Sequence, residues 1–186
     1  MIPRWSYLIK PYGKEYNNTK TIADQDFVIN TSIEDATFVN RLGVVCAVPS
    51  GGQIPLGSLV VVHHNVFRTY LDMKGKKRKS NEYFRDGQYL VNPNRIYLYA
   101  DEDRWKTVPG YCFVSPVDYI QDSEIYRSDK EKEEHVGLLR HGSVDEVELG
   151  QTIGFTKNSE YEFTIDGEKL YRMRNSDICI KFNEDG

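Results

Sequence analysis

Four sequence landmarks occur twice along the chain in the same order, and this repeat constrains the fold more than any other feature. Each landmark is a short apolar run beside a proline or a glycine. In the first copy the landmarks are residues 7–11, 42–45, 56–60 and 86–90, and in the second copy 112–116, 136–139, 149–153 and 166–170. Equivalent landmarks lie 105, 94, 93 and 80 residues apart. Such self-similarity indicates that one structural unit is present twice.

The decreasing separations show where the first copy is longer than the second. The extra residues fall in a loop at 12–41 and in an insertion at about 67–85. A short charged stretch at 100–104 follows a strand-like run, which is typical of a domain boundary. We therefore expect a first domain at residues 1–100 and a second at 105–186.

Strand signals dominate both copies. The β-branched and aromatic runs between turn residues are 7–10, 42–48, 58–63, 89–91, 96–99, 111–114, 137–139, 152–155, 161–165, 170–173 and 178–182. No segment keeps a 3.6-residue apolar period over three turns. The sequence therefore predicts an all-β protein, with barrels or sandwiches favoured.

Composition narrows the classes of function and the expected location. The 24 basic and 28 acidic side chains are interspersed, which argues against a general polyanion binder. No signal-peptide pattern and no apolar stretch approaching 18 residues occurs, so we expect neither export nor membrane insertion. Cys46, Cys112 and Cys179 lack metal or redox spacing and are expected to be reduced core residues of a cytoplasmic protein.

Three segments of the second copy resemble the chaperonin-10 family of GroES-like proteins. They are residues 124–137, 144–155 and 165–178, and the last reads IDGEKLYRMRNSDI against the family ending DGEEYLILRESDIL. In the first copy, residues 27–32 and 40–48 are similar to the family's loop and the strand after it. The resemblance implies two tandem, partly open GroES-like β-barrels, in a family whose members form sevenfold rings that cap an ATP-driven chaperonin.

The same resemblance implies where the partner would bind. In the family an apolar triplet of a long loop docks on the chaperonin, and the matching residues here are Phe27, Val28 and Ile29. In the second copy they are Ile125 and Tyr126, with Arg127 in place of a third apolar residue. Independently of the family, a loop of about 30 residues without a strand or helix pattern is typically functional or disordered. The alternative is that Phe27 to Ile29 form an extra buried strand.

The function that follows is that of a co-chaperonin and not of an enzyme. The expected partners are a GroEL-like chaperonin, an unfolded client protein and further copies of the chain, with ATP bound only by the chaperonin and no cofactor here. No nucleophile, phosphate-loop or dinucleotide motif is present, so no catalytic residue is assigned. The alternative is a structural or assembly protein, such as a virion or ring component. Arg127 and the short segments 49–55 and 141–147, where the family has a long roof hairpin, favour that alternative.

Two further groups of residues are candidate sites. Lys74, Lys76, Lys77, Arg78 and Lys79 form a basic run that could contact phosphates or an acidic partner, but a solvated hairpin tip is favoured and nucleic-acid binding is the less favoured hypothesis. His63 and His64 are adjacent in a predicted strand, so they should point to opposite faces, and no second cluster has metal-ligand spacing. No metal site is expected.

Overall fold

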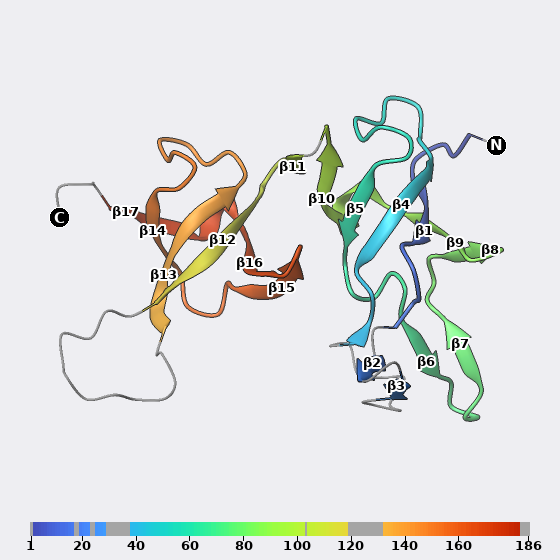
Figure 1. The fold of residues 1–186 in the computed structure, drawn as a ribbon. Helices are drawn as coiled ribbons and strands as arrows, with labels where there is room; N and C mark the ends of the chain where they lie inside the picture. Colours follow the sequence, from blue (N-terminus) through green and yellow to red (C-terminus); the bar gives the residue numbers. More distant parts are fainter. Residues whose placement is uncertain are drawn as a thin grey trace. The chain divides into compact units, whose positions relative to one another are not determined.

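The chain divides into two compact units, Met1–Trp105 and Lys106–Gly186. The computed structural model describes residues 2–16, 19–22, 25–28, 38–102, 104–118 and 132–182 (Figure 1). Across these residues the elements are strands and two short 3-10 helices, η2 (Pro93–Arg95) and η3 (Asn175–Asp177). The predicted all-β class is confirmed. Within the described segments, no helix has the length and apolar character needed to cross a membrane.

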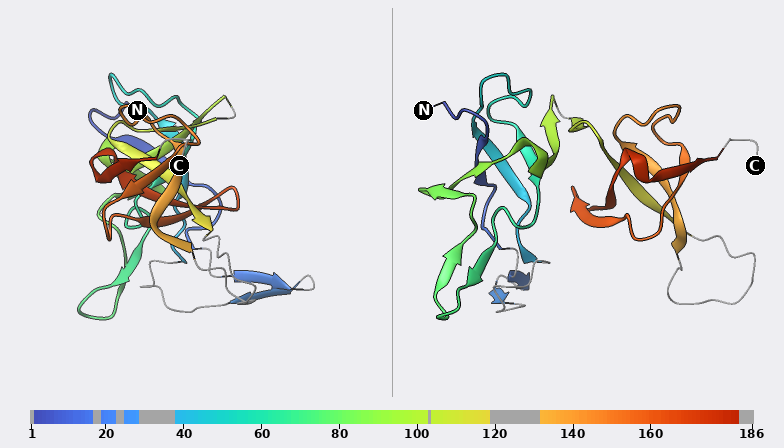
Figure 2. Two further views of the ribbon diagram at one scale, coloured as in Figure 1. Left: turned by 90° about the vertical axis from the view of Figure 1, so that its left-hand side faces the viewer. Right: turned by 180° about the vertical axis from the view of Figure 1, so that it is seen from behind.

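The first unit is built on a seven-stranded sheet with the order β11-β10-β5-β4-β1-β9-β8. Its strands are β1 (Tyr7–Pro11), β4 (Leu42–Ala47), β5 (Leu59–Val62), β8 (Tyr83–Arg85), β9 (Gln88–Val91), β10 (Ile96–Asp101) and β11 (Arg104–Thr107). The boundary between the units falls within β11, after Trp105. Two separate two-stranded sheets are formed by β2 (Thr19–Ile22) with β3 (Gln25–Val28), and by β6 (Thr69–Leu71) with β7 (Lys77–Lys79). The β6–β7 hairpin projects away from the main sheet of this unit in every view (Figure 1, Figure 2).

The second unit is built on a six-stranded sheet with the order β15-β16-β12-β13-β14-β17. Its strands are β12 (Tyr111–Asp118), β13 (Lys132–His141), β14 (Thr152–Phe155), β15 (Tyr161–Ile165), β16 (Glu168–Arg174) and β17 (Ile178–Lys181). In both main sheets the end strands pair on one side only, so neither sheet is closed by the described strands.

Six strands follow the same order in the two units. The series β10-β5-β4-β1-β9-β8 corresponds to β17-β14-β13-β12-β16-β15. The register corresponds as well, since Pro11 pairs with Gly43 where Pro116 pairs with Gly137. The first strand of each unit also has its register shift at the equivalent position, between Leu8 and Ile9 and between Phe113 and Val114.

One detail of the sequence repeat is wrong. The structure pairs Tyr7 with Val91 and Cys112 with Met173, so equivalent residues of β9 and β16 are 82 apart, not 80. The two Asp-Gly turns have the same backbone, with φ of 50° at each aspartate and 70° or 81° at each glycine. The turns match in sequence because the turn requires these residues, but the arms of the second hairpin are longer.

Each unit has its own apolar core on its main sheet. The first is built around Ile9, Val45, Val60, Phe67, Tyr89 and Leu98, all 1% exposed or less, and the second around Cys112, Val114, Leu139, Ile153 and Met173. The buried Cys112 agrees with the sequence prediction. Cys179 is exposed and Cys46 is only half-buried, so the prediction of three core cysteines is wrong for Cys179. It lies on β17, an end strand, whose residues beyond Ile178 are exposed.

The sequence missed the elements that lack a simple apolar alternation. Every one of the eleven predicted runs falls on a strand, but β2, β3, β6, β7, β8 and β11 were not predicted. The loop at 12–41 was expected to have no strand, and it contains the β2–β3 hairpin, in which Thr19 pairs with Val28. Short polar strands are stabilised by pairing with a neighbour, which a single segment does not reveal.

Candidate docking surface on the first unit

The long loop leaves and re-enters the first unit at a fixed stem. Tyr16 forms a β-bridge with Val39, and the Asn40 amide N–H donates to the Glu15 carbonyl over 2.9 Å. The Asn40 side chain, only 3% exposed, donates from Nδ2 to the carbonyls of Tyr12 and Lys14, each at 2.8 Å. Its Oδ1 accepts from the Leu42 amide at 2.9 Å. One buried amide therefore joins the outgoing and the returning chain.

The candidate chaperonin-binding residues fall partly within the described structure. Phe27 and Val28 lie in β3, opposite Lys20 and Thr19 of β2. Ile29, Ile125 and Tyr126 lie outside the described residues. The segment of the second unit that contains Ile125 and Tyr126 is closed by pairing of Asp118 with Lys132. In both units the segment connects the first strand to the next strand of the main sheet.

The same stem fixes the base of the β6–β7 hairpin. The Thr69 amide donates to the Tyr16 hydroxyl at 2.8 Å, and that hydroxyl donates to the Thr69 carbonyl at 3.1 Å. The Glu15 carboxylate forms an ion pair with Lys79 and accepts from the Tyr89 hydroxyl at 2.8 Å. Burial and this hydrogen bond to Glu15 raise the pKa of Tyr89. Glu15 and Tyr16 thus connect the loop stem, the core and the hairpin.

The basic residues occupy the strand and turn of this hairpin, which confirms the hairpin interpretation of the sequence. Asp72 organises the turn, because its carboxylate accepts from the amides of Lys74 at 3.0 Å and Lys76 at 2.9 Å and from Arg78 Nε at 3.0 Å. The hydrogen bond from the Lys76 amide, with that from Arg78, lowers the pKa of Asp72.

The five candidate basic residues divide into two groups. Arg78 is paired with Asp72 and Lys79 with Glu15. Lys74, Lys76 and Lys77 are exposed and form no recorded ion pair with any described residue. The hairpin thus presents three ammonium groups that have no ion-pair partner among the described residues.

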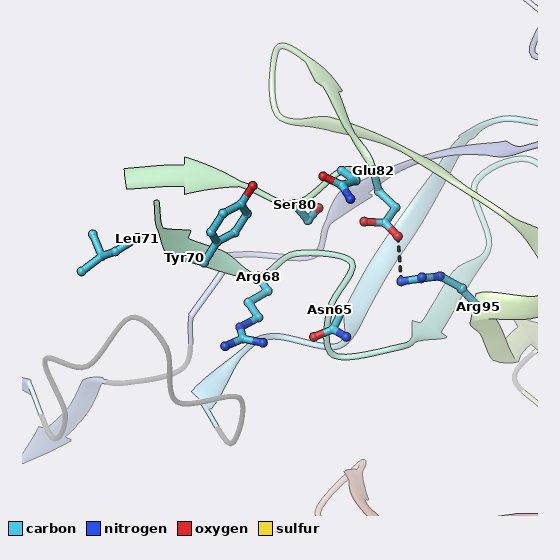
Figure 3. Close-up of a pocket in the computed structure, with 8 residues that line it drawn as sticks. Asn65, Arg68, Tyr70, Leu71, Ser80, Glu82 and Arg95 are labelled. Carbon is cyan, nitrogen blue, oxygen red and sulfur yellow. Dashed lines mark ion pairs between the residues drawn. The ribbon is translucent and has the colours of Figure 1, made fainter. Parts of the chain in front are cut away.

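An open pocket of about 470 Å³ lies at the base of the hairpin (Figure 3). Its lining residues are Asn65, Arg68, Tyr70, Leu71, Ser80, Asn81, Glu82 and Arg95. Glu82 and Arg95 form an ion pair with 2.7 Å between Oε1 and Nη1. The Ser80 hydroxyl donates to the Val66 carbonyl at 2.5 Å. Ser80 therefore has no activating base in this arrangement, and the pocket has the character of a polar contact surface beside partly exposed Tyr70 and Leu71.

The two adjacent histidines do not have the predicted orientation. β5 ends at Val62, and the rings of His63 and His64 stack with centroids 4.1 Å apart instead of pointing to opposite faces. His63 Nδ1 accepts from the Asn65 amide at 3.0 Å. Burial, with the nearby His63 and Arg41, lowers the pKa of His64 to about 4. No group of three or more potential metal-ligating side chains occurs in the described part of the chain.

Comparison of the chain with protein-family models and with curated proteins finds no match in either set. Sequence reasoning did not identify Glu15, Tyr16 or Asn40, which build the stem. Their partners Lys79, Thr69 and Tyr12 are far from them in the sequence, so no local sequence pattern predicts these contacts.

Proposed function

We propose that the protein is a co-chaperonin with two GroES-like units, which caps a chaperonin ring and assists folding of a client protein. The observation that carries the proposal is the position of the two long segments. Each leaves its sheet after the first strand and returns at an equivalent Pro–Gly pair, Pro11 with Gly43 and Pro116 with Gly137. One chain thus presents two segments from two units with the same strand order.

The stem in the first unit suits such a role. Ordering a long segment on binding costs several kcal/mol. A segment whose two ends are already fixed has less chain to order, so this cost is smaller. Asn40, Glu15 and Tyr16 fix the ends within the folded unit. Phe27, Val28 and Ile29 would provide the apolar contact with the partner, and burial of such a side chain contributes about 1.5–3 kcal/mol.

Repetition of weak contacts would supply the remaining affinity. Linked sites raise the effective concentration of each other without any new contact. Ile125 and Tyr126 of the second unit would add contacts, although the neighbouring Arg127 reduces the apolar character of that triplet. ATP would bind only to the chaperonin.

A structural or assembly protein is the second candidate function. It is favoured by the tight turns at the positions where the GroES-like family has a long hairpin that forms the roof of its ring. The Gly52 amide donates to the Pro49 carbonyl at 2.9 Å in the first unit, and the Val147 amide donates to the Val144 carbonyl at 3.2 Å in the second. Such a protein would use the same fold for assembly without binding a chaperonin.

Retention of the protein on an immobilised GroEL-type chaperonin, with and without ADP or ATP, tests the proposal. We expect nucleotide-dependent retention of the wild type and its loss in a Val28→Glu, Ile29→Glu variant. A Thr156→Glu, Thr164→Glu variant, which adds the same charge at exposed positions of the second unit, serves as the matched control. A wild type that is not retained with any nucleotide would overturn the co-chaperonin proposal and leave the assembly function.

A further inference from the structure

The two units carry charge of opposite sign, although their main sheets share strand order and register. Residues 1–105 contain 14 basic and 11 acidic side chains, a net charge of +3, and residues 106–186 contain 10 basic and 17 acidic side chains, a net charge of −7. A sign difference between two halves of similar fold suggests complementary surfaces.

The positive feature is the tip of the β6–β7 hairpin, here called the basic tip and defined as Met73, Lys74, Lys76 and Lys77. It is present only in the first unit, where residues 63–82 connect β5 to β8, whereas residues 156–160 connect the equivalent β14 and β15. Its three ammonium groups form no recorded ion pair within the described structure, and the Met73 side chain is fully exposed.

The negative feature is the turn before β14, here called the acidic turn and defined as Asp145, Glu146, Glu148 and Leu149. Its three acidic residues are exposed, and no ion pair of theirs is recorded among the described residues. The Lys181 ammonium donates to the Glu146 carbonyl oxygen. Leu149 is 66% exposed, at the corner of the turn that leads to Gly150.

The equivalent turn of the first unit ends in the same Leu-Gly corner but carries no charge. Leu56 has the place of Leu149 and is 68% exposed, and Gly57 has φ of 84° where Gly150 has 89°. Residues 51–55 before it, Gly-Gly-Gln-Ile-Pro, carry no charge. The acidic turn is therefore specific to the second unit, as the basic tip is specific to the first.

We propose that the basic tip of one chain binds the acidic turn of a second copy of the chain, so that chains associate head to tail. Three ammonium groups would meet three carboxylates, with Met73 and Leu149 supplying an apolar centre. Such a contact is heterologous, because one surface meets a different surface on the neighbour, and repeated contacts of this kind close a ring or extend a filament. Opposite charges would place a first unit beside a second unit and exclude two like units.

Reciprocal charge reversal tests the contact. One variant carries Lys74→Glu, Lys76→Glu and Lys77→Glu, and the other carries Asp145→Lys, Glu146→Lys and Glu148→Lys. Molar mass by light scattering at low salt should be that of an oligomer for the wild type and 21.6 kDa for each variant alone. An equimolar mixture of the two variants should regain the mass of the wild type, because each chain then supplies the surface that the other needs.

An Arg4→Glu, Lys10→Glu, Lys14→Glu variant makes the same charge change at other exposed positions of the first unit and should assemble as the wild type does. Circular dichroism of each chain checks that it is folded. A monomeric wild type, variants that keep the mass of the wild type, or a mixture that does not assemble would each overturn the proposal. Self-association through this contact does not depend on the co-chaperonin function, since no chaperonin is present in the assay.

Discussion

Gly43 and Gly137 have the same place in the two sheets, opposite the proline that ends the first strand. A Cβ at Gly43 would lie 2.9 Å from the Lys10 carbonyl oxygen and 2.9 Å from the Phe67 ring. At Gly137 it would lie 2.7 Å from the Ser115 carbonyl oxygen. Backbone cannot move aside as a flexible side chain can, so glycine is required by close packing and not by a turn.

We predict that Gly43→Ala and Gly137→Ala each lower the free energy of unfolding by about 1–3 kcal/mol, the usual cost of overpacking a core. Urea denaturation followed by fluorescence measures the change. Thr156→Ala, at an exposed site, should be close to neutral. An unchanged urea midpoint for both glycine variants would contradict the prediction, because it would mean that the strands move apart to fit the methyl group without loss of stability.

His64 should make the stability of the protein depend on pH. Its pKa in the folded protein is about 4, against 6.5 for the free side chain, so the unfolded chain binds a proton more readily between these values. The contribution to stability is therefore present above pH 6.5 and is lost as the pH falls from 6.5 to 4. In His64→Gln the fall in unfolding free energy from pH 7.5 to pH 5 should be smaller than in the wild type by about 1 kcal/mol. The difference stays this small because solvent screens the partly exposed ring. The same fall in both proteins would contradict the assignment.

At the scale of elements, the stem of the long loop and the hairpin beside it depend on a few side-chain hydrogen bonds. Asn40 makes three bonds to backbone groups while nearly buried, and Tyr16 both donates to and accepts from Thr69. The hairpin strands β6 and β7 have three residues each and are mostly exposed, so packing alone contributes little to holding them. Their stability is concentrated in the stem.

We predict that Asn40→Ala lowers the unfolding free energy by about 1–3 kcal/mol, because buried backbone groups lose their partners. Asn40→Asp should cost more, since a carboxylate oxygen would replace the donor that faces the carbonyls of Tyr12 and Lys14. Amide hydrogen exchange should rise first at Leu42, whose N–H donates to Asn40. Exchange that rises equally throughout the first unit would argue against a local role in the stem.

At the scale of the whole molecule, each unit has a separate core and a separate main sheet. Units of this size usually unfold cooperatively on their own. We predict two thermal transitions in differential scanning calorimetry. Gly43→Ala should lower one and Gly137→Ala the other, each by about 4–8 °C for every kcal/mol lost. A single transition that moves with either substitution would mean that the two units unfold as one.

The amino-acid sequence by itself determined the all-β class, the positions of the main strands and the landmarks of the repeat. Apolar alternation and turn residues such as Asp86-Gly87 are local signals, because each reflects the backbone at its own position. The proposed loop triplet also came from local residue types, and Phe27 and Val28 remain candidates on that basis.

Only the tertiary structure decided which residues contact one another. It stacked His63 on His64 beyond the end of β5, joined Glu15 to Lys79 and Tyr89, and placed Asn40 between Tyr12 and Lys14. It also placed Cys179 on an exposed end strand and gave the β2–β3 and β6–β7 hairpins their pairing. The contacts of Glu15 and Asn40 join residues far apart in the chain, so no single segment predicts them. The histidine stacking and the two hairpins are local, but they depend on where a strand ends and on which neighbour it pairs with, and the apolar pattern does not show this.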